Sequence, residues 1–226
     1  MQAMLESKIL KIIKRVEQRK NNANNTLNVL LTAYFPVALK LRPAGLYRLD
    51  EFNDKVNGLS KEEKKIASEL GLALAPWASV NKQIPLEHNW YFILPKGSEL
   101  KENLNFNFYA YVDTGRILGY PSCCVESAGE DACLGLNSDL RAIEHVKLYK
   151  SQGRKIDPLV YYTWGFIPCK PSCSKALETG HKIYSAYLKI NRNVAEAYKR
   201  ICTNWIDIMG EIAEEPTEKL FISADE

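Results

Sequence analysis

The sequence lacks several features that would assign a function directly. No stretch of its 226 residues approaches the roughly 18 continuous apolar residues of a membrane-spanning helix. The net charge is only +3, which argues against a protein dedicated to coating nucleic acid. The GxGxxG, P-loop and GxSxG motifs are absent, and so is the CxxxCxxC run of radical enzymes that use S-adenosylmethionine.

Histidine is also scarce. The sequence has three histidines, none of which forms a His-x-x-x-His pair: His88, His145 and His181. His181 follows Cys173 by eight residues on roughly the same side of a predicted helix, so it is a candidate ligand or proton carrier. A histidine on a helix surface is the alternative. Glu126, two residues after Cys124, is a candidate base, and an ordinary first-turn glutamate is at least as consistent with the pattern.

The composition indicates a globular protein. Hydrophobic residues make up 46% and charged residues 25%, which predicts a packed core rather than disorder. The first twenty residues are amphipathic and lack the apolar core of a secretory signal, so we expect a cytoplasmic location. In that compartment six cysteines are thiols or metal ligands more often than a disulfide framework.

The pattern of apolar residues predicts an α+β fold that is predominantly helical, with a small sheet of short strands packed with several helices. We expect a single domain over residues 1–226. A loose division separates a helical N-terminal part, residues 1–97, from a cysteine-bearing C-terminal part, residues 98–226.

Helical spacing of apolar residues, with capping and stop signals, predicts six helices: 5–20, 26–35, 60–70, 138–150, 171–190 and 193–214. The second should end at Pro36, which lacks the N–H that a helix requires. The basic face of helix 5–20 suggests an RNA or protein partner or an anionic membrane surface, and a solvated face is the simpler interpretation.

Aromatic and β-branched runs predict the strands. The best candidate is 89–94, closed by Pro95, and a second is 106–112, where apolar and polar residues alternate. These two strands are expected to pair. Residues 160–166 are expected to form a short aromatic strand or extended run.

Two short segments share an arrangement of proline and cysteine. The first is Gly119-Tyr120-Pro121-Ser122-Cys123-Cys124, and the second is Pro168-Cys169-Lys170-Pro171-Ser172-Cys173. Each follows an aromatic stretch and precedes a predicted helix. Proline suits the first helical turn, and the positive end of the helix dipole stabilises a thiolate, the form that binds metal or attacks an electrophile.

The spacing within each segment suggests which sulfurs converge. Cys169 and Cys173 are four residues apart, which on one helix face lets both reach a common centre. The neighbours Cys123 and Cys124 are expected to point in different directions, so that commonly only one of them would ligate the same atom. The other could bind a second metal, act as a redox partner or pack inside. These spacings match neither the usual zinc finger nor the standard ferredoxin run, and thiolates suit both zinc and iron–sulfur clusters.

Other roles for these cysteines stay open. Either pair could cycle between dithiol and disulfide without metal, and buried cysteine is also a small core hydrophobe. Core packing is the better interpretation for Cys202, which lies on an apolar stripe, whereas Cys133 is either a fifth ligand or a bystander. Four aromatic residues either line a pocket or belong to the core: Tyr120, Tyr161, Tyr162 and Trp164.

The motifs GYPSCCVE (119–126) and PCKPSC (168–173) together resemble an uncharacterised prokaryotic family, well represented in archaea, that is catalogued as domain of unknown function family 483. The likeness covers mainly the C-terminal half. It implies a shared site at Cys123, Cys124, Cys169 and Cys173, and it implies no reaction.

The leading hypothesis from the sequence is therefore a cytoplasmic metalloprotein. Its iron–sulfur cluster, the first choice, or zinc would be held by Cys169, Cys173 and at least one of Cys123 and Cys124. One alternative is a metal-free thiol/disulfide redox protein. The other is a non-catalytic, zinc-stabilised interaction module that uses the basic helix 5–20. Whether the protein is an enzyme stays open; if it is one, redox or sulfur chemistry at an open metal site is the hypothesis.

Overall fold

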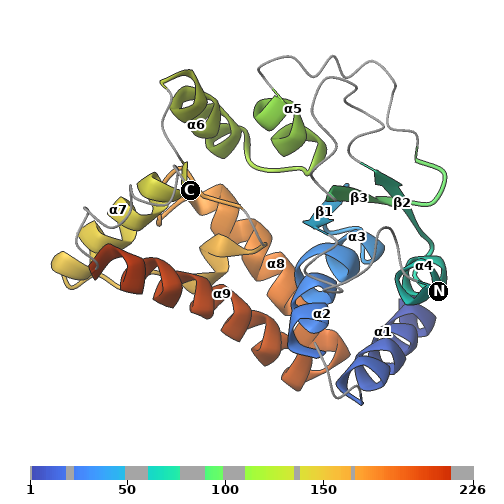
Figure 1. Cartoon of the computed structure of the whole chain (residues 1–226). Helices are drawn as coiled ribbons and strands as arrows, with labels where there is room; N and C mark the ends of the chain where they lie inside the picture. The colour runs from blue at the N-terminus through green and yellow to red at the C-terminus, as the bar shows by residue number, and fades with distance from the viewer. Residues whose placement is uncertain are drawn as a thin grey trace, which may run out of the picture.

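Figure 1 shows the computed structural model, which describes residues 2–18, 23–48, 61–76, 90–98, 110–134, 138–163 and 166–214. The fold is predominantly helical α+β, as the sequence predicts. A small sheet lies on one side of a body of helices (Figure 1). Two neighbouring helices, α5 (Ala110–Ile117) and α6 (Ser122–Cys133), stand over the same body. No helix in these ranges has both the length and the apolar character needed to cross a membrane.

The sheet has three antiparallel strands in the order β1-β3-β2: β1 (Gly45–Arg48), β2 (Leu72–Pro76) and β3 (Trp90–Pro95). The predicted strand 89–94 is confirmed as β3. Gly45 of β1 lies opposite Ile93, and Leu74 of β2 is also opposite Ile93. Because β3 is paired on both edges, it has no edge left for the predicted partner 106–112.

That second strand prediction is wrong over the residues that the structure describes. Residues 110–112 begin α5 (Ala110–Ile117), and residues 106–109 lie outside the described ranges. The alternation of apolar and polar residues favoured a strand, but the residues that follow carry the signals of a helix C-terminus. Arg116 stands in the last turn, and Gly119, two residues after the last helical residue, adopts a φ of 70°, a left-handed conformation that glycine tolerates.

The N-terminal helix and its neighbour confirm two further predictions. In α1 (Gln2–Glu17) the apolar face is buried through Ile9, Ile12, Ile13 and Val16. Helix α4 (Lys61–Glu69) ends before Gly71, which has a φ of 71°. Arg15 of α1 forms ion pairs with Glu62 and Glu69 of α4 at 2.9 and 3.1 Å. Part of the basic face therefore contacts the protein itself.

Pro36 does not end the second helix, contrary to the prediction. The chain runs from α2 (Ala23–Val29) through a π-helical turn, η1 (Leu30–Tyr34), into α3 (Phe35–Ala38). Proline has no N–H to give the carbonyl four residues earlier, which is that of Thr32. The Thr32 oxygen instead accepts from Arg42 Nη1 at 3.2 Å and from Thr163 Oγ1 at 2.9 Å.

The C-terminal half confirms three long helices: α7 (Ser138–Ser151), α8 (Ser174–Ile190) and α9 (Arg192–Glu214). The strand or extended run predicted for 160–166 is wrong at residues 160 and 161, which belong to a 3₁₀ turn, η4 (Pro158–Tyr161), and residues 164 and 165 lie outside the described ranges. Asp157 caps this turn by accepting from the Leu159 N–H at 3.0 Å, and Pro158 occupies its first position.

One apolar core joins elements from both halves of the chain. It includes residues of α1, η1, α7, η4, α8 and α9. The Tyr187 hydroxyl donates to the Leu31 carbonyl at 2.6 Å, and the Tyr198 hydroxyl donates to the Tyr162 carbonyl at 2.7 Å. The helix ends that carry the cysteines are therefore attached to a well-packed body.

Candidate metal centre

Two cysteines lie in the first turn of α6 (Ser122–Cys133), as the sequence predicts. The Pro121 carbonyl accepts from the N–H groups of Cys124 and Val125 at 2.9 and 3.0 Å, which sets the direction in which the helix starts. Cys124 and Val125 are buried, whereas Cys123 is half-buried. The start of the helix therefore presents both sulfurs toward the protein body.

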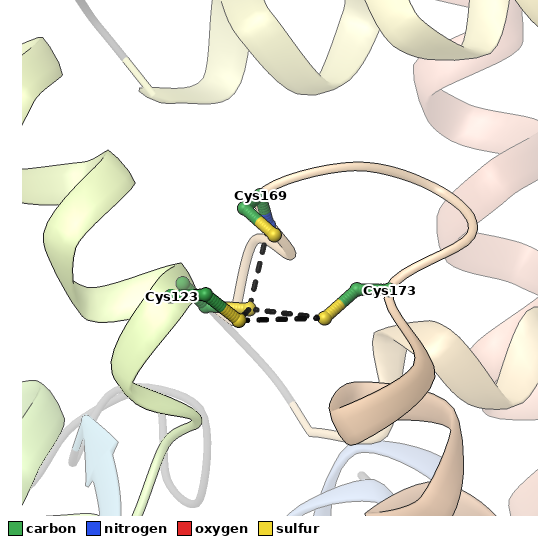
Figure 2. Close-up of side chains that lie close together, drawn as sticks. Cys123, Cys169 and Cys173 are labelled. Carbon is green, nitrogen blue, oxygen red and sulfur yellow. Dashed lines mark hydrogen bonds between the residues drawn. The ribbon is translucent and has the colours of Figure 1, made fainter.

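The other two cysteines come from the turn that precedes α8. Cys173 is the N-cap of α8, and its N–H donates to the Lys170 carbonyl at 3.0 Å. Cys169 lies in this turn and not on the helix, so the expectation of a shared helix face is wrong. Pro168 and Pro171 are both buried and restrict the turn. The reversal of the chain brings the two sulfurs together, as Figure 2 shows.

The four sulfurs converge on a common centre. The Sγ atoms of Cys123 and Cys124 are 4.0 Å apart, and Cys173 Sγ lies 3.8 and 3.7 Å from them. With Cys169 included, all four ligand atoms lie within 4.8 Å of one another. Figure 2 shows Cys123 and Cys173 pointing toward each other, with Cys169 above them. The expectation that only one of Cys123 and Cys124 reaches the common centre is therefore wrong, because both sulfurs lie in the group.

Hydrogen bonds to sulfur support this arrangement. The backbone N–H of Cys169 donates to Cys124 Sγ at 3.4 Å. Burial raises the pKa of Cys124, and burial also raises the pKa of Cys169, to about 11. Burial acts in the same direction on Cys173, but hydrogen bonds from the Ala176 N–H and the neighbouring thiols outweigh it and lower its pKa. Without a cation, Cys173 therefore ionises more readily than Cys124 and Cys169.

The remaining candidates lie apart from this cluster. Cys133 is exposed at the far end of α6, and Cys202 is fully buried in the core, as expected for packing. Glu126 is exposed on α6. His181 is exposed on α8 and lies 3.0 Å from Asp157 Oδ2. None of these four belongs to the group of potential ligands among the described residues. His88 lies outside the described residues.

Three aromatic residues pack together within the apolar core that also contains Cys124 and Cys173. Tyr120, Tyr162 and Phe166 pack with ring centroids 4.5 to 6.3 Å apart. Tyr120 and Tyr162 thus belong to the core, whereas Trp164 lies outside the described residues. Sequence reasoning missed Arg42, whose guanidinium lies 5.3 and 5.8 Å from the centroids of Tyr120 and Tyr162. No pattern in the sequence around Arg42 indicates that it packs against these aromatic rings, because they are distant from it along the chain.

Comparisons with known proteins place the cysteines in a defined family region. Residues 98–200 match the family model described as "Protein of unknown function (DUF483)", and this range contains all four clustered cysteines. No curated protein and no solved structure matches the chain. The motifs of residues 119–126 and 168–173 both lie in this matched region, so the region 98–200 is similar to the DUF483 family.

Proposed function

We propose that Cys123, Cys124, Cys169 and Cys173 bind a single metal ion, zinc, and that this ion fixes α6 against the turn before α8. The observation that carries the proposal is the spacing of the sulfurs. Four sulfurs at the usual zinc–sulfur distance of about 2.3 Å stand about 3.8 Å apart at the corners of a tetrahedron. The three Sγ–Sγ distances among Cys123, Cys124 and Cys173 are 3.7 to 4.0 Å.

The same spacing favours one ion over an iron–sulfur cluster, which was the first choice from the sequence. In a four-iron cluster each cysteine binds a different iron, so its sulfurs must stand further apart than around one ion. Here all four fit within 4.8 Å. We therefore place zinc first and an iron–sulfur cluster second, and metal analysis distinguishes them.

The electrostatics of the cluster also favour a cation. Four crowded thiols cannot all ionise, because each thiolate raises the pKa of the others. A divalent cation removes that penalty and lets all four bind as thiolates. The N–H groups of Cys169 and Ala176 already point at Cys124 and Cys173, where they would stabilise metal-bound sulfur.

The donor set points to a structural role. Zinc sites with four protein ligands are closed, whereas catalytic sites keep one position for water or substrate. The ion would join segments that are 45 to 50 residues apart in sequence. Such a cross-link fixes a long loop that folding would otherwise have to order at an entropic cost.

Single substitutions test the proposal. Cys124→Ser and Cys173→Ser should each lower the zinc content of purified protein to a small fraction of the parent value. Cys133→Ser is the matched control on the same helix, because Cys133 is exposed and outside the cluster. Full zinc content in both Cys124→Ser and Cys173→Ser would contradict the proposal.

Thiol counting separates this proposal from the metal-free redox alternative. An occupied zinc site hides four thiols until a chelator is added. A dithiol/disulfide pair instead changes the count by two between reducing and oxidising conditions, with no effect of chelation.

A further inference from the structure

A second polar cluster lies further along α6, on the side that faces α7. It consists of Asp131 on α6, Arg141 and His145 on α7, and Tyr161 in η4. We call it the Arg141 cluster. It shares no residue with the four cysteines, and its contacts do not involve them.

On one side of the Arg141 guanidinium, Nη1 already has two partners. Its Nη1 lies 2.8 Å from Asp131 Oδ2 and donates to Ser127 Oγ, also on α6. The opposite edge carries Nε and Nη2. Both atoms are buried, and neither has a hydrogen-bond partner within the described part of the chain. This edge presents two parallel N–H groups, the fork that binds a carboxylate or phosphate in bidentate fashion.

Two further side chains that interact electrostatically with Arg141 also carry unsatisfied polar atoms. The Tyr161 hydroxyl and His145 Nδ1 are buried and likewise have no partner among the described residues. Burial raises the pKa of Tyr161 to about 12, and burial lowers the pKa of His145. The positive charge of Arg141 lowers both pKa values, so a single guanidinium lies within electrostatic reach of both.

The cluster thus offers four hydrogen-bond donors and no matching acceptor in this part of the structure. Arg141 supplies two of them, Tyr161 one, and the neutral His145 supplies one from Nδ1 in the corresponding tautomer. Buried donors without an acceptor are costly, and a small oxyanion would accept from all of them. Asp131 and Ser127 would hold the guanidinium in the required orientation.

We propose that the Arg141 cluster binds an oxyanion, a carboxylate or a phosphate group, through Nε and Nη2 of Arg141, the Tyr161 hydroxyl and His145 Nδ1. The cluster reaches the surface, because the Arg141 side chain is 14% exposed and His145 is half-buried. Arg141 and His145 are one helical turn apart on α7, so one group can contact both.

Calorimetric titration of the full chain with inorganic phosphate, and separately with acetate, tests this inference. Saturable binding of either anion supports it, and the tighter of the two identifies the chemical source of the oxyanion. Arg141→Lys should weaken binding at least about ten-fold, because an ammonium group cannot form the bidentate fork. Arg154→Lys is the matched control, since Arg154 is exposed and donates to Tyr149 instead.

Tyr161→Phe provides an independent test that does not perturb the ion pair. Without an anion, its melting temperature should equal or exceed that of the parent, because the lost hydroxyl has no protein partner. With the anion, binding should weaken several-fold.

Three results would overturn the inference. Absence of binding by both anions would mean that these donors face water alone. Binding that is unchanged in Arg141→Lys and Tyr161→Phe would mean an adventitious ion only. A lower melting temperature of Tyr161→Phe without anion would show that the hydroxyl already has a partner.

Discussion

Helix α6 and the pair α8–α9 are held to the molecule by different forces. In α8 and α9 the buried residues are mostly large or apolar: Ala176, Ile183, Tyr187, Val194, Ala195, Tyr198, Cys202 and Met209. In α6, by contrast, Val125 is the only buried aliphatic side chain among the described residues, beside Cys124 and Asp131. Figure 1 shows α5 and α6 standing over one end of the helical body.

Burial of apolar side chains therefore does not by itself explain how α6 is held in position. Each buried aliphatic side chain contributes about 1.5 to 3 kcal/mol, so α8 and α9 are well anchored without further help. Helix α6 depends on its cysteines at one end and on the ion pair between Asp131 and Arg141 at the other. A metal at the cysteines would replace the apolar anchor that α6 lacks.

Metal removal has the largest expected effect on this comparison. Chelation of the purified protein should release α6 while α8 and α9 stay folded, because structural zinc contributes about 10 kcal/mol or more to the segments that it joins. Hydrogen–deuterium exchange should show faster exchange over 124–131 and little change over 176–187. Equal loss of protection in both segments would mean that the two regions do not differ in this way.

Gly180→Ala should disrupt the packing of the well-anchored helix α8 against η4. A Cβ at Gly180 would collide with the carbonyl of Leu159, so α8 and η4 would have to separate. We expect a loss of about 3 kcal/mol in the free energy of unfolding, measured by urea denaturation.

Gly210→Ala is the control for this change. Its added Cβ would meet the flexible end of the Lys150 side chain, and alanine favours a helix by about 1 kcal/mol over glycine. It should therefore be neutral or stabilising. A similar large loss in both variants would argue against the specific contact between α8 and η4.

Cys202→Ala should distinguish a cysteine that packs in the core from the buried cysteines of the sulfur cluster, Cys124 and Cys173. Cys202 lies on α9 and is fully buried in the apolar core of the protein, so its truncation should cost about 1 kcal/mol of stability through lost packing. The zinc content should be unchanged, unlike that of Cys173→Ser. Loss of zinc in Cys202→Ala, with the protein still folded, would contradict the assignment of Cys202 to the core.

The last prediction is a pH dependence from the same residue, which is confined to alkaline conditions. Burial raises the pKa of Cys202 from its ordinary value of about 9 to about 12, so folding favours the neutral thiol. Its contribution is complete below about pH 9 and is lost as the pH rises toward 12. The stability of the parent should thus fall relative to Cys202→Ala over that range, as measured by urea denaturation. A constant difference would contradict this linkage.

Sequence patterns predicted the long amphipathic helices because their apolar spacing repeats over many residues. The failures lie where a local signal competes with tertiary contacts. At Pro36 the helix continues because Arg42 and Thr163 take up the Thr32 carbonyl, a contact between distant segments. At residues 160–166 the aromatic pattern indicated a strand, although Asp157-Pro158 was a capping signal available in the sequence.

For the site, the shared pattern of proline and cysteine was sufficient to select the four residues that converge. It did not specify their directions. Whether both Cys123 and Cys124 face the centre depends on where α6 begins, which Pro121 sets through its carbonyl. The contacts of Arg42 join segments far apart in sequence, and Arg141 pairs with Asp131 of the preceding helix, so no local pattern indicated either set.

Metal and sulfide analysis, with an absorption spectrum, of protein purified without oxygen tests the central claim most directly. The account predicts one zinc per chain, no acid-labile sulfide and no visible colour. Iron with acid-labile sulfide and a brown chromophore would replace zinc by a cluster at the same cysteines. Absence of any metal would contradict the account and leave thiol chemistry or packing as the role of Cys123, Cys124, Cys169 and Cys173.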